Sequence, residues 1–345
     1  MIRFECDYTE GCIPEILAAI SQENHTQLKG YSEDPICEKA RKKIKALCGN
    51  EDVDVHFLVG GTQTNTTVIA ATLRPYQGVI SVDAGHINCH ETGAIEATGH
   101  KVLAIANETG KLTAKQISDY CAAHEADASF EHIVQPAMVY ISHPAENGAL
   151  YSLQELQDIR RVCDEWSLTL FVDGARLGYG LTSPATDVTI QDLAKLTDVF
   201  YIGGTKCGAL MGEAVVIRKD SLKKDFRYMI KRQGGMLAKG WLLGIQFDKL
   251  FEEDRYFTVC KKAVDQALRI KKAFEEKGCS FFMESFTNQQ FPVLHKDILK
   301  KFDEKYSYCV WQKIDDDHTA VRFCTSWATT DAQVDALIED INKFL

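Results

Sequence analysis

The stretch "LTLFVDGARLGYG", residues 168–180, contains the pattern that decides the fold. It opens with a mostly apolar run, Leu168–Asp173, which is typical of a β-strand covered on both faces. Gly174 then lets the chain turn away, and Arg176 follows closely. Ligands of open α/β sheets bind outside the carboxyl ends of the strands, so Asp173 is a candidate functional residue. Taken alone, the pattern also fits a structural ion pair between Asp173 and Arg176.

A second strand end follows about one helix-and-strand unit later, in "DVFYIGGTKCGAL", residues 198–210. Val199–Ile202 has the composition of a buried strand, and glycines flank Lys206 on both sides. The spacing predicts that Asp173 and Lys206 lie at neighbouring strand ends. A solvated loop lysine is the alternative to a reactive amine at this position.

The chain around these two segments alternates short β-branched runs with helical patterns, which predicts an α/β fold with a mostly parallel central sheet covered by helices. Helix ends are marked by capping signals, such as Asp34–Pro35 before a helix that stops at Gly49, and by capping-box spacings at Ser152 and Thr113. The predicted strands are Val55–Val59, Val79–Asp83, Lys101–Ile105, Ala137–Ser142, Leu168–Asp173, Val199–Ile202 and Glu213–Arg218.

The pattern changes after about residue 250. A long amphipathic helix through Val259 and Phe274 precedes three short predicted strands and a final helix. We therefore predict a large domain, residues 1–250, which includes the N-terminal segment, and a smaller C-terminal α+β domain, residues 251–345. The short strands predicted there are Cys279–Met283, Ser307–Trp311 and Ala320–Thr325.

Composition excludes several classes of function. The net charge of −10 provides no electrostatic footprint for nucleic acid, and anionic membrane surfaces would repel the chain. The first residues lack the pattern of a signal peptide, and no apolar run approaches the roughly 20 residues that span a bilayer. Twelve cysteines occur without a C-x-x-C pair, which favours reduced core cysteines in a cytoplasmic protein.

A third strand end occurs in "HFLVGGTQTN", residues 56–65, where Gly60, Gly61 and Thr62 form a predicted turn before a helix that begins near Thr66. Free amides at a helix start and a threonine hydroxyl suit a phosphate group. The order of phosphate turn, Asp173 and Lys206 matches the needs of pyridoxal 5'-phosphate. In this reading Lys206 forms a covalent Schiff base, and Asp173 keeps the pyridine nitrogen protonated.

The motifs around these residues resemble those of the threonine aldolase and β-eliminating lyase family of pyridoxal-phosphate enzymes, which have the aspartate-aminotransferase fold (fold type I). The most specific match is "FVDGARLGYG", which resembles H-x-D-G-A-R-L, and "GGTQTN" resembles the phosphate-binding S-G-T-x-x-N turn. Weaker matches cover most of the rest of the chain, in "GYSEDP", "VDAGHINCHETGAIEATGH" and "TAVRFCTSWATT".

The resemblance implies further site residues. His86 would stack on the cofactor ring, and Arg322, helped by Arg176, would bind the substrate carboxylate; Asp7 and Tyr31 would also contact the substrate. His143 is expected to be the counterpart of an active-site histidine. A metal site at His86, His90 and Glu91 is not expected, because Gly85 and Gly93 interrupt the helix and no third ligand is evident.

The chain departs from the family pattern at three places. A family S-D-T is Cys6–Asp7–Tyr8 here, and the E-N-T-H-N stretch is "ISHPAENG". Leu237 stands where the family has an arginine that reaches a neighbouring subunit's phosphate. Lys231, Arg232 and Lys239 are candidates to replace that arginine.

The resemblance implies cleavage of a β-hydroxy-α-amino acid, L-threonine or L-allo-threonine, to glycine and an aldehyde by retro-aldol chemistry. His143, His86 or an ordered water would take the hydroxyl proton. The first alternative is a β-eliminating lyase acting on cysteine, serine or a related amino acid, and the second is a non-catalytic binding protein on the same fold. The expected partner is an amino-acid substrate, with no nucleic acid and no membrane, and the expected assembly is a homodimer or homotetramer.

Overall fold

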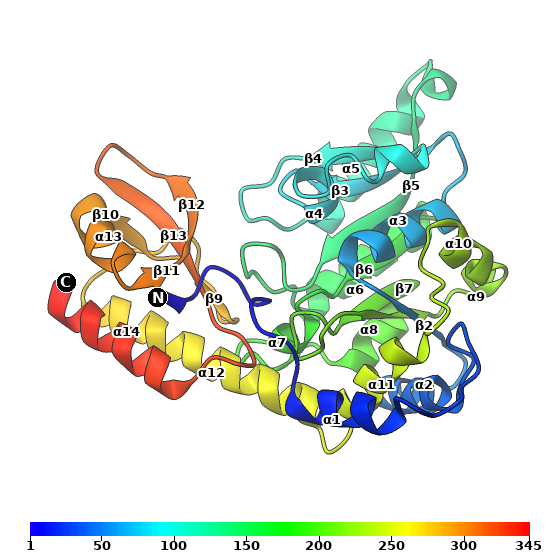
Figure 1. The fold of residues 1–345 in the computed structure, drawn as a ribbon. Helices are drawn as coiled ribbons and strands as arrows, with labels where there is room; N and C mark the ends of the chain where they lie inside the picture. The colour runs from blue at the N-terminus through cyan, green and yellow to red at the C-terminus, as the bar shows by residue number, and fades with distance from the viewer.

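The computed structural model describes residues 1–345, which form a large lobe and a small lobe joined by one long helix, α12 (Arg255–Glu276) (Figure 1). The large lobe contains a seven-stranded sheet in the order β2-β8-β7-β6-β5-β3-β4. Its strands are β2 (Asp54–Leu58), β3 (Gln77–Val82), β4 (Lys101–Ile105), β5 (Gln135–Ser142), β6 (Thr169–Asp173), β7 (Val199–Gly203) and β8 (Glu213–Ile217).

Most neighbours in this sheet are parallel, and only β8 runs antiparallel to its neighbours β2 and β7. The predicted mostly parallel sheet is therefore confirmed. Each predicted strand of the large domain is present, with ends that differ by at most two residues.

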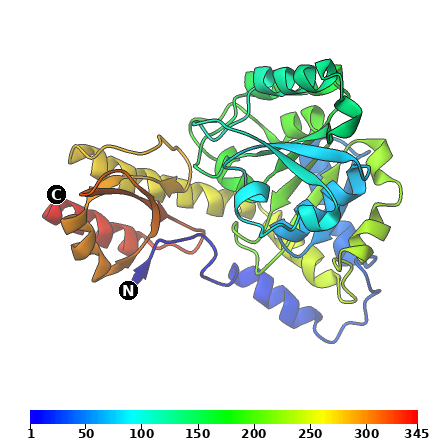
Figure 2. The same ribbon diagram turned by 90° about the horizontal axis from the view of Figure 1, so that it is seen from above.

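Both faces of the sheet are buried, as the apolar strand sequences require. Along β7, Phe200 and Ile202 belong to one apolar core, whereas Val199 and Tyr201 belong to the core on the opposite face. This alternation follows from the two-residue period of a strand, and helices cover both sides of the sheet (Figure 2). These helices are α1 (Pro14–Glu23), α2 (Pro35–Cys48), α3 (Gly61–Thr72), α4 (His86–Cys89), α5 (Ala114–Ala126), α6 (Leu153–Glu165), α7 (Leu177–Leu181), α8 (Ile190–Leu196), α9 (Asp220–Lys223), α10 (Phe226–Arg232) and α11 (Trp241–Leu250).

The predicted capping signals are used. Asp34 accepts a hydrogen bond from the Cys37 amide at the start of α2, and Gly49 ends that helix in the left-handed conformation. Thr113 and Ser152 form capping boxes at α5 and α6. One helix start was predicted wrongly: α3 begins at Gly61 rather than near Thr66, because Val59 and Gly60 are enough to connect β2 to the helix.

Two glycines allow the carboxyl ends of β6 and β7 to approach closely. A Cβ atom on Gly174 would lie 1.9 Å from the Tyr201 carbonyl oxygen, and one on Gly203 would lie 2.3 Å from the Ala175 carbonyl oxygen. The Gly203 amide instead donates a 2.9 Å hydrogen bond to the Gly174 carbonyl. These contacts explain why glycine follows Asp173 and precedes Lys206.

The small lobe packs α12, α13 (Lys296–Asp303) and α14 (Asp331–Phe344) around a core of its own. Its antiparallel sheet has β10, β13 and β12 in that order, and β9 also pairs with β13. The predicted strand Cys279–Met283 is wrong, since only an isolated bridge between Phe281 and Pro292 forms there. The strands are β1 (Ile2–Arg3), β9 (Gln289–Gln290), β10 (Val293–His295), β11 (Tyr306–Ser307), β12 (Cys309–Lys313) and β13 (His318–Cys324).

The N-terminal segment joins the two lobes. Ile2 and Arg3 pair with β11, and Phe4 lies in the core of the small lobe (Figure 1). The first residues therefore pack with the small lobe, although the sequence placed them in the large domain. The predicted division at residue 250 falls between α11 and α12. None of the helices combines the length and the apolar character needed to cross a membrane.

Candidate active site

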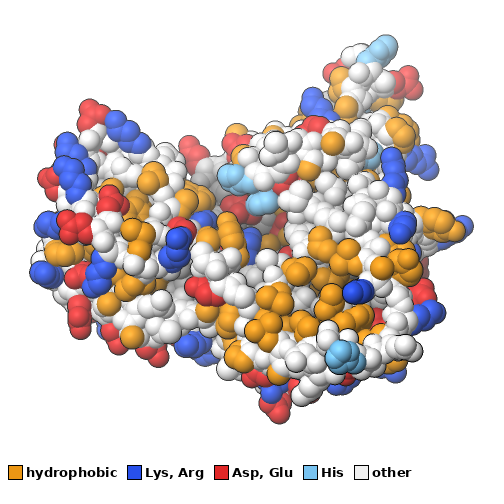
Figure 3. All heavy atoms as spheres, viewed as in Figure 1, with side chains coloured by type: hydrophobic (Ala, Val, Ile, Leu, Met, Phe, Trp, Pro, Cys, Tyr) orange, Lys and Arg blue, Asp and Glu red, His pale blue; other side chains and the backbone are white.

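A cavity of about 600 Å³ lies between the lobes, beyond the carboxyl ends of β6 and β7. Figure 3 shows this hollow with acidic and basic side chains at its edges. Eight of the residues predicted for the site line it: Gly60, Gly61, Thr62, His86, Asp173, Arg176, Lys206 and Arg322. The fold thus gathers into one cavity residues that are far apart in the sequence.

Asp173 ends β6 and is almost completely buried. One carboxylate oxygen accepts hydrogen bonds from the Tyr201 hydroxyl (2.5 Å) and the Ala175 amide (2.9 Å). The other accepts from the Tyr140 hydroxyl (2.5 Å) and the Asn65 amide group (3.2 Å). Four donors hold the carboxylate in one orientation and stabilise its negative charge.

Lys206 lies in the loop between β7 and β8, and its side chain lines the cavity. The Tyr179 hydroxyl donates a 2.6 Å hydrogen bond to the Lys206 carbonyl, which fixes the backbone. The Nζ atom of Lys206 lies 6.0 Å from the centre of the Tyr8 ring. The amine makes no ion pair within the chain. Glu213 lines the same cavity and accepts hydrogen bonds from the Gly204 amide and the Thr205 hydroxyl, and burial raises the pKa of Glu213 to about 8.

The first turn of α3 faces the cavity with Gly60, Gly61 and Thr62. Its first amides have no carbonyl partner within the helix, and no side chain caps them. A Cβ atom on Gly61 would lie 3.2 Å from the Tyr201 hydroxyl that serves Asp173. Glycine therefore keeps open a space in which the positive end of the helix dipole can bind an anion.

A hydrogen-bonded chain connects Asp173 to His86. The Asn65 side chain donates to Asp173 and also to Glu91 (2.7 Å), and the same Glu91 oxygen lies 2.8 Å from Nδ1 of His86. Burial lowers the pKa of His86, but the hydrogen bond to Glu91 and the charges of Glu146 and Asp173 outweigh it, so the pKa is raised overall. The ring is thus held at the cavity wall with Nδ1 turned to Glu91.

Arg176 pairs with Asp7 rather than with Asp173. Its Nε and one terminal nitrogen donate to the two oxygens of Asp7 at 2.7 and 3.0 Å, and Asn288 donates to Asp7 at 3.0 Å. The structural ion pair considered between Asp173 and Arg176 does not form. Asp7, predicted as a substrate contact, is completely buried and does not line the cavity.

Arg322 reaches the cavity from β13 of the small lobe. One terminal nitrogen donates a 2.9 Å hydrogen bond to the Glu5 carbonyl, and the guanidinium lies 5.6 Å from the centre of the Trp311 ring. The other terminal nitrogen makes no hydrogen bond within the chain and is not buried, so its donors remain for a ligand in the cavity.

Two further predicted site residues, His143 and Tyr31, do not line the cavity. His143 follows β5 and is completely buried, with its Nδ1 accepting a 3.4 Å hydrogen bond from the Tyr151 amide. Burial lowers the pKa of His143 to about 4. Tyr31 is half exposed near Lys231 and lines a separate hollow. The structure therefore brings neither residue to this chain's own cavity.

Sequence reasoning assigned no role to Asn65 and Glu146, and it considered Glu91 only as a metal ligand. Asn65 was visible as the last residue of the phosphate-turn motif, but its contact with Asp173 depends on the fold. Glu146 lines the cavity where His143 was expected. In E-N-T-H-N the histidine directly precedes an asparagine, and Glu146 directly precedes Asn147, so alignment on the asparagine would have selected Glu146.

The cavity fits pyridoxal 5'-phosphate by the chemistry of its donors. The amides of α3 suit the phosphate, the oriented carboxylate of Asp173 suits a protonated ring nitrogen, and the amine of Lys206 suits the aldehyde. His86 lies on the same wall, where a ring could stack.

Comparison with known proteins agrees with this chemistry. A family profile described as "Beta-eliminating lyase" matches residues 8–296. A low specificity L-threonine aldolase from Pseudomonas sp. (strain NCIMB 10558) is 27% identical over 99% of this chain and 98% of its own length. A solved structure of Leishmania major threonine aldolase is 41% identical, covers 99% of both chains and superposes with a TM-score of 0.97.

A more distant neighbour identifies the wider fold. An aspartate aminotransferase variant from Thermus thermophilus superposes with a TM-score of 0.71 at 13% identity, over 100% of this chain and 92% of its own. The predicted aspartate-aminotransferase fold is thereby confirmed, and family and fold together imply pyridoxal phosphate as cofactor. The prediction of a pyridoxal-phosphate-dependent lyase is also confirmed. The chain belongs to the family of β-eliminating lyases.

Proposed function

We propose that this protein is a pyridoxal-phosphate-dependent threonine aldolase, which cleaves L-threonine or L-allo-threonine to glycine and acetaldehyde. The observation that carries the chemistry is the single cavity shared by Lys206, Asp173 and the start of α3. The choice of substrate is supported by the similar proteins from Pseudomonas and Leishmania major, which are named as threonine aldolases.

In this proposal Lys206 anchors the cofactor covalently, and Asp173 holds a proton on the ring nitrogen. The amides of Gly61 and Thr62 bind the phosphate, while His86 packs against the ring. When bound, the cofactor accepts the electron pair of the bond that breaks at the substrate Cα. The residues of the chain orient the substrate so that the correct bond is broken.

Arg322 is proposed to bind the substrate carboxylate, because one of its terminal nitrogens has no partner in the chain and guanidinium and carboxylate match geometrically. Arg176 contributes one terminal nitrogen, since Asp7 occupies the rest of its guanidinium. Asp7 therefore positions Arg176 and does not itself contact the substrate.

β-Elimination from cysteine or serine is the second candidate, because the matching family is described as β-eliminating lyases. It would use Lys206 to remove the Cα proton. Incubation with threonine and with cysteine separates the two functions, since the first releases acetaldehyde and the second releases pyruvate.

The test of the covalent anchor is borohydride reduction followed by peptide mass analysis. We expect a stable cofactor adduct on the peptide containing Lys206, and we expect Lys206→Ala to lose both the adduct and threonine cleavage. Lys195→Ala, which removes an exposed lysine on α8, is the matched control and should retain both. Full activity in Lys206→Ala would overturn the proposal.

We also propose a homodimer or homotetramer in the cytoplasm. Apolar side chains gather on the face of the large lobe around α11 (Figure 3). Exposed apolar residues beside α11 include Leu210 and Met211, whose amides donate to Gln246 of that helix, and Leu17 on α1, a helix that packs against α11. All twelve cysteines are free thiols, which supports a reducing compartment.

A further inference from the structure

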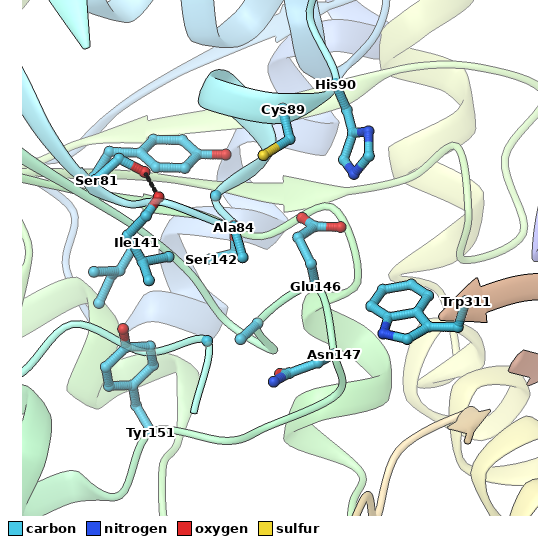
Figure 4. A pocket seen from close by; sticks show the side chains of 15 residues that line it. Ser81, Ala84, Cys89, His90, Ile141, Ser142, Glu146, Asn147, Tyr151 and Trp311 are labelled. Carbon is cyan, nitrogen blue, oxygen red and sulfur yellow. Dashed lines mark hydrogen bonds between the residues drawn. The ribbon is translucent and has the colours of Figure 1, made fainter. Parts of the chain in front are cut away.

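A smaller pocket of about 180 Å³ adjoins the main cavity (Figure 4). Most of its wall comes from β3, β5 and the loop after β5, with Val82, Ile141, Ala145 and Tyr151 among its apolar residues. Three residues line both spaces: His90, Glu146 and Trp311. A substituent on the substrate Cβ that extends from the main cavity into this pocket therefore passes among His90, Glu146 and Trp311.

Glu146 differs from the other two carboxylates in the main cavity. Asp173 accepts four hydrogen bonds, and Glu213 accepts two. Glu146 accepts none within the chain, and its only ion-pair partner is a terminal nitrogen of Arg176 at 3.8 Å. Its side chain is 19% exposed, so it is sheltered but open to the cavity. Its lone pairs remain available to a ligand.

The histidines that could act in its place are less suitable. Nδ1 of His86 is engaged with Glu91, and the pKa of His86 is raised, which favours the protonated ring. His143 lies outside both pockets. The ring of His90 points toward the same space as Glu146 (Figure 4), but His90 is exposed at the edge.

We propose that Glu146 is the catalytic base that takes the proton from the β-hydroxyl of the substrate, an inference that rests on the proposed aldolase function. The hydroxyl proton passes to a carboxylate oxygen, the oxygen–hydrogen electron pair forms the C=O bond of the aldehyde, and the Cα–Cβ electron pair stays with the glycine fragment, where bound pyridoxal phosphate would accept it. Water then gives a proton to Cα, and Glu146 gives its proton to the hydroxide that remains, so the reaction neither gains nor loses protons overall. Arg176, which is proposed to help bind the substrate carboxylate, lies 3.8 Å from Glu146 and thereby holds Glu146 near the substrate.

The test compares substrates with and without a β-hydroxyl. We expect Glu146→Gln to lower kcat for threonine cleavage by about 10²- to 10⁴-fold, the usual contribution of a general base. Glycine has no hydroxyl, so its dissociation constant, measured by titration of cofactor absorbance, and the exchange of its Cα hydrogen, measured by NMR in D₂O, should stay at wild-type values. Affinity of the apoprotein for pyridoxal phosphate should also stay unchanged.

Glu108→Gln removes an exposed carboxylate two residues from Gly110, which lines the same pocket, and this control should behave as wild type. If Glu146→Gln does not fold, Glu146→Ala with added formate replaces it, and formate should restore part of the lost cleavage. Cleavage at the wild-type rate in the folded variant, or parallel loss of glycine binding, overturns the assignment. Wild-type protein that releases no aldehyde from either L-threonine or L-allo-threonine overturns the proposed function first, and the inference with it.

Discussion

At the scale of single residues, pairing and burial determine which charged groups can meet a ligand. Arg176 and Asp7 are both predicted from sequence motifs to bind the substrate. In the structure, Nε and one terminal nitrogen of Arg176 instead donate hydrogen bonds to Asp7, which is completely buried. Burial raises the pKa of Asp7. The charges of Arg176 and Lys206 and the hydrogen bonds from Arg176 and Asn288 lower this pKa by more than burial raises it, so the pKa falls to about 2. Asp7 therefore stabilises the folded chain mainly through its charge.

This pair predicts a specific dependence of stability on pH. The folded pKa of about 2 lies below the unfolded value of about 3.9, so the contribution of Asp7 is complete above about pH 5 and is lost as pH falls toward 2. Asp7→Asn should lower the free energy of unfolding at pH 7 by about 3 kcal/mol, because it leaves a buried guanidinium unpaired. Urea unfolding measured from pH 7 to pH 3 should show that the difference in the free energy of unfolding between wild type and Asp7→Asn becomes smaller as the pH falls.

Asp316→Asn is the control for this series, because Asp316 is 96% exposed and pairs only with Lys313. It should change stability little at any pH. A constant gap between wild type and Asp7→Asn across the whole range would contradict the assigned role of Asp7.

At the scale of elements, the start of α3 is the most informative unit. The helix begins about five residues before its predicted start near Thr66, so its first amides open directly into the cavity. Gly60 precedes it with an extended φ of −178°, and a Cβ there would meet no atom within 4 Å. A side chain at residue 60 is therefore compatible with the backbone and with the space around it.

We expect Gly60→Ser, which restores the residue of the family motif, to tighten pyridoxal phosphate binding. One added hydroxyl donor to a phosphate corresponds to about a fivefold lower dissociation constant, or roughly 1 kcal/mol. Gly60→Ala is the matched control and should bind as wild type does. Fluorescence titration of the apoprotein measures all three constants, and equal effects of serine and alanine would exclude a hydrogen bond to phosphate.

At the scale of the whole molecule, the cavity is built by both lobes, but three predicted site residues, Asp7, His143 and Tyr31, stay outside it. Arg322 and Trp311 come from the small lobe, and the N-terminal segment ties that lobe to Arg176 through Glu5 and Asp7. Tyr31 lies 5.3 Å from Lys231 in a separate hollow. If Tyr31 contributes to an active site, that site belongs to a second copy of the chain.

Subunit complementation tests this arrangement. Lys206→Ala and Tyr31→Ala should each be inactive or impaired as homo-oligomers. If Tyr31 serves the partner's cavity, co-expression should restore about a quarter of wild-type activity, because half of randomly paired dimers contain one intact site. Light scattering should give the mass of a dimer or tetramer. A monomer, or mixtures no more active than the separate variants, would contradict the prediction.

Much of the fold could be read from local patterns. The apolar runs predicted all seven strands of the large sheet, and the capping residues predicted the starts of α2, α5 and α6, because strand burial and helix capping depend on nearby residues. No strand forms at Cys279–Met283, because these residues follow a helix and pair with the neighbouring segment only at the bridge between Phe281 and Pro292. The order Gly60–Thr62, Asp173, Lys206 identified a cavity at the strand ends, because parallel strands place their carboxyl ends on one edge.

The sequence by itself therefore determined the class of fold, the cofactor chemistry and the edge of the sheet where both meet. Only the tertiary structure decided which polar groups are free: it paired Arg176 with Asp7, buried His143, linked His86 to Asp173 through Asn65 and Glu91, and left Glu146 open. The physical reason is that these contacts join residues up to 169 positions apart, and a local pattern carries no information on which of several charged groups will meet.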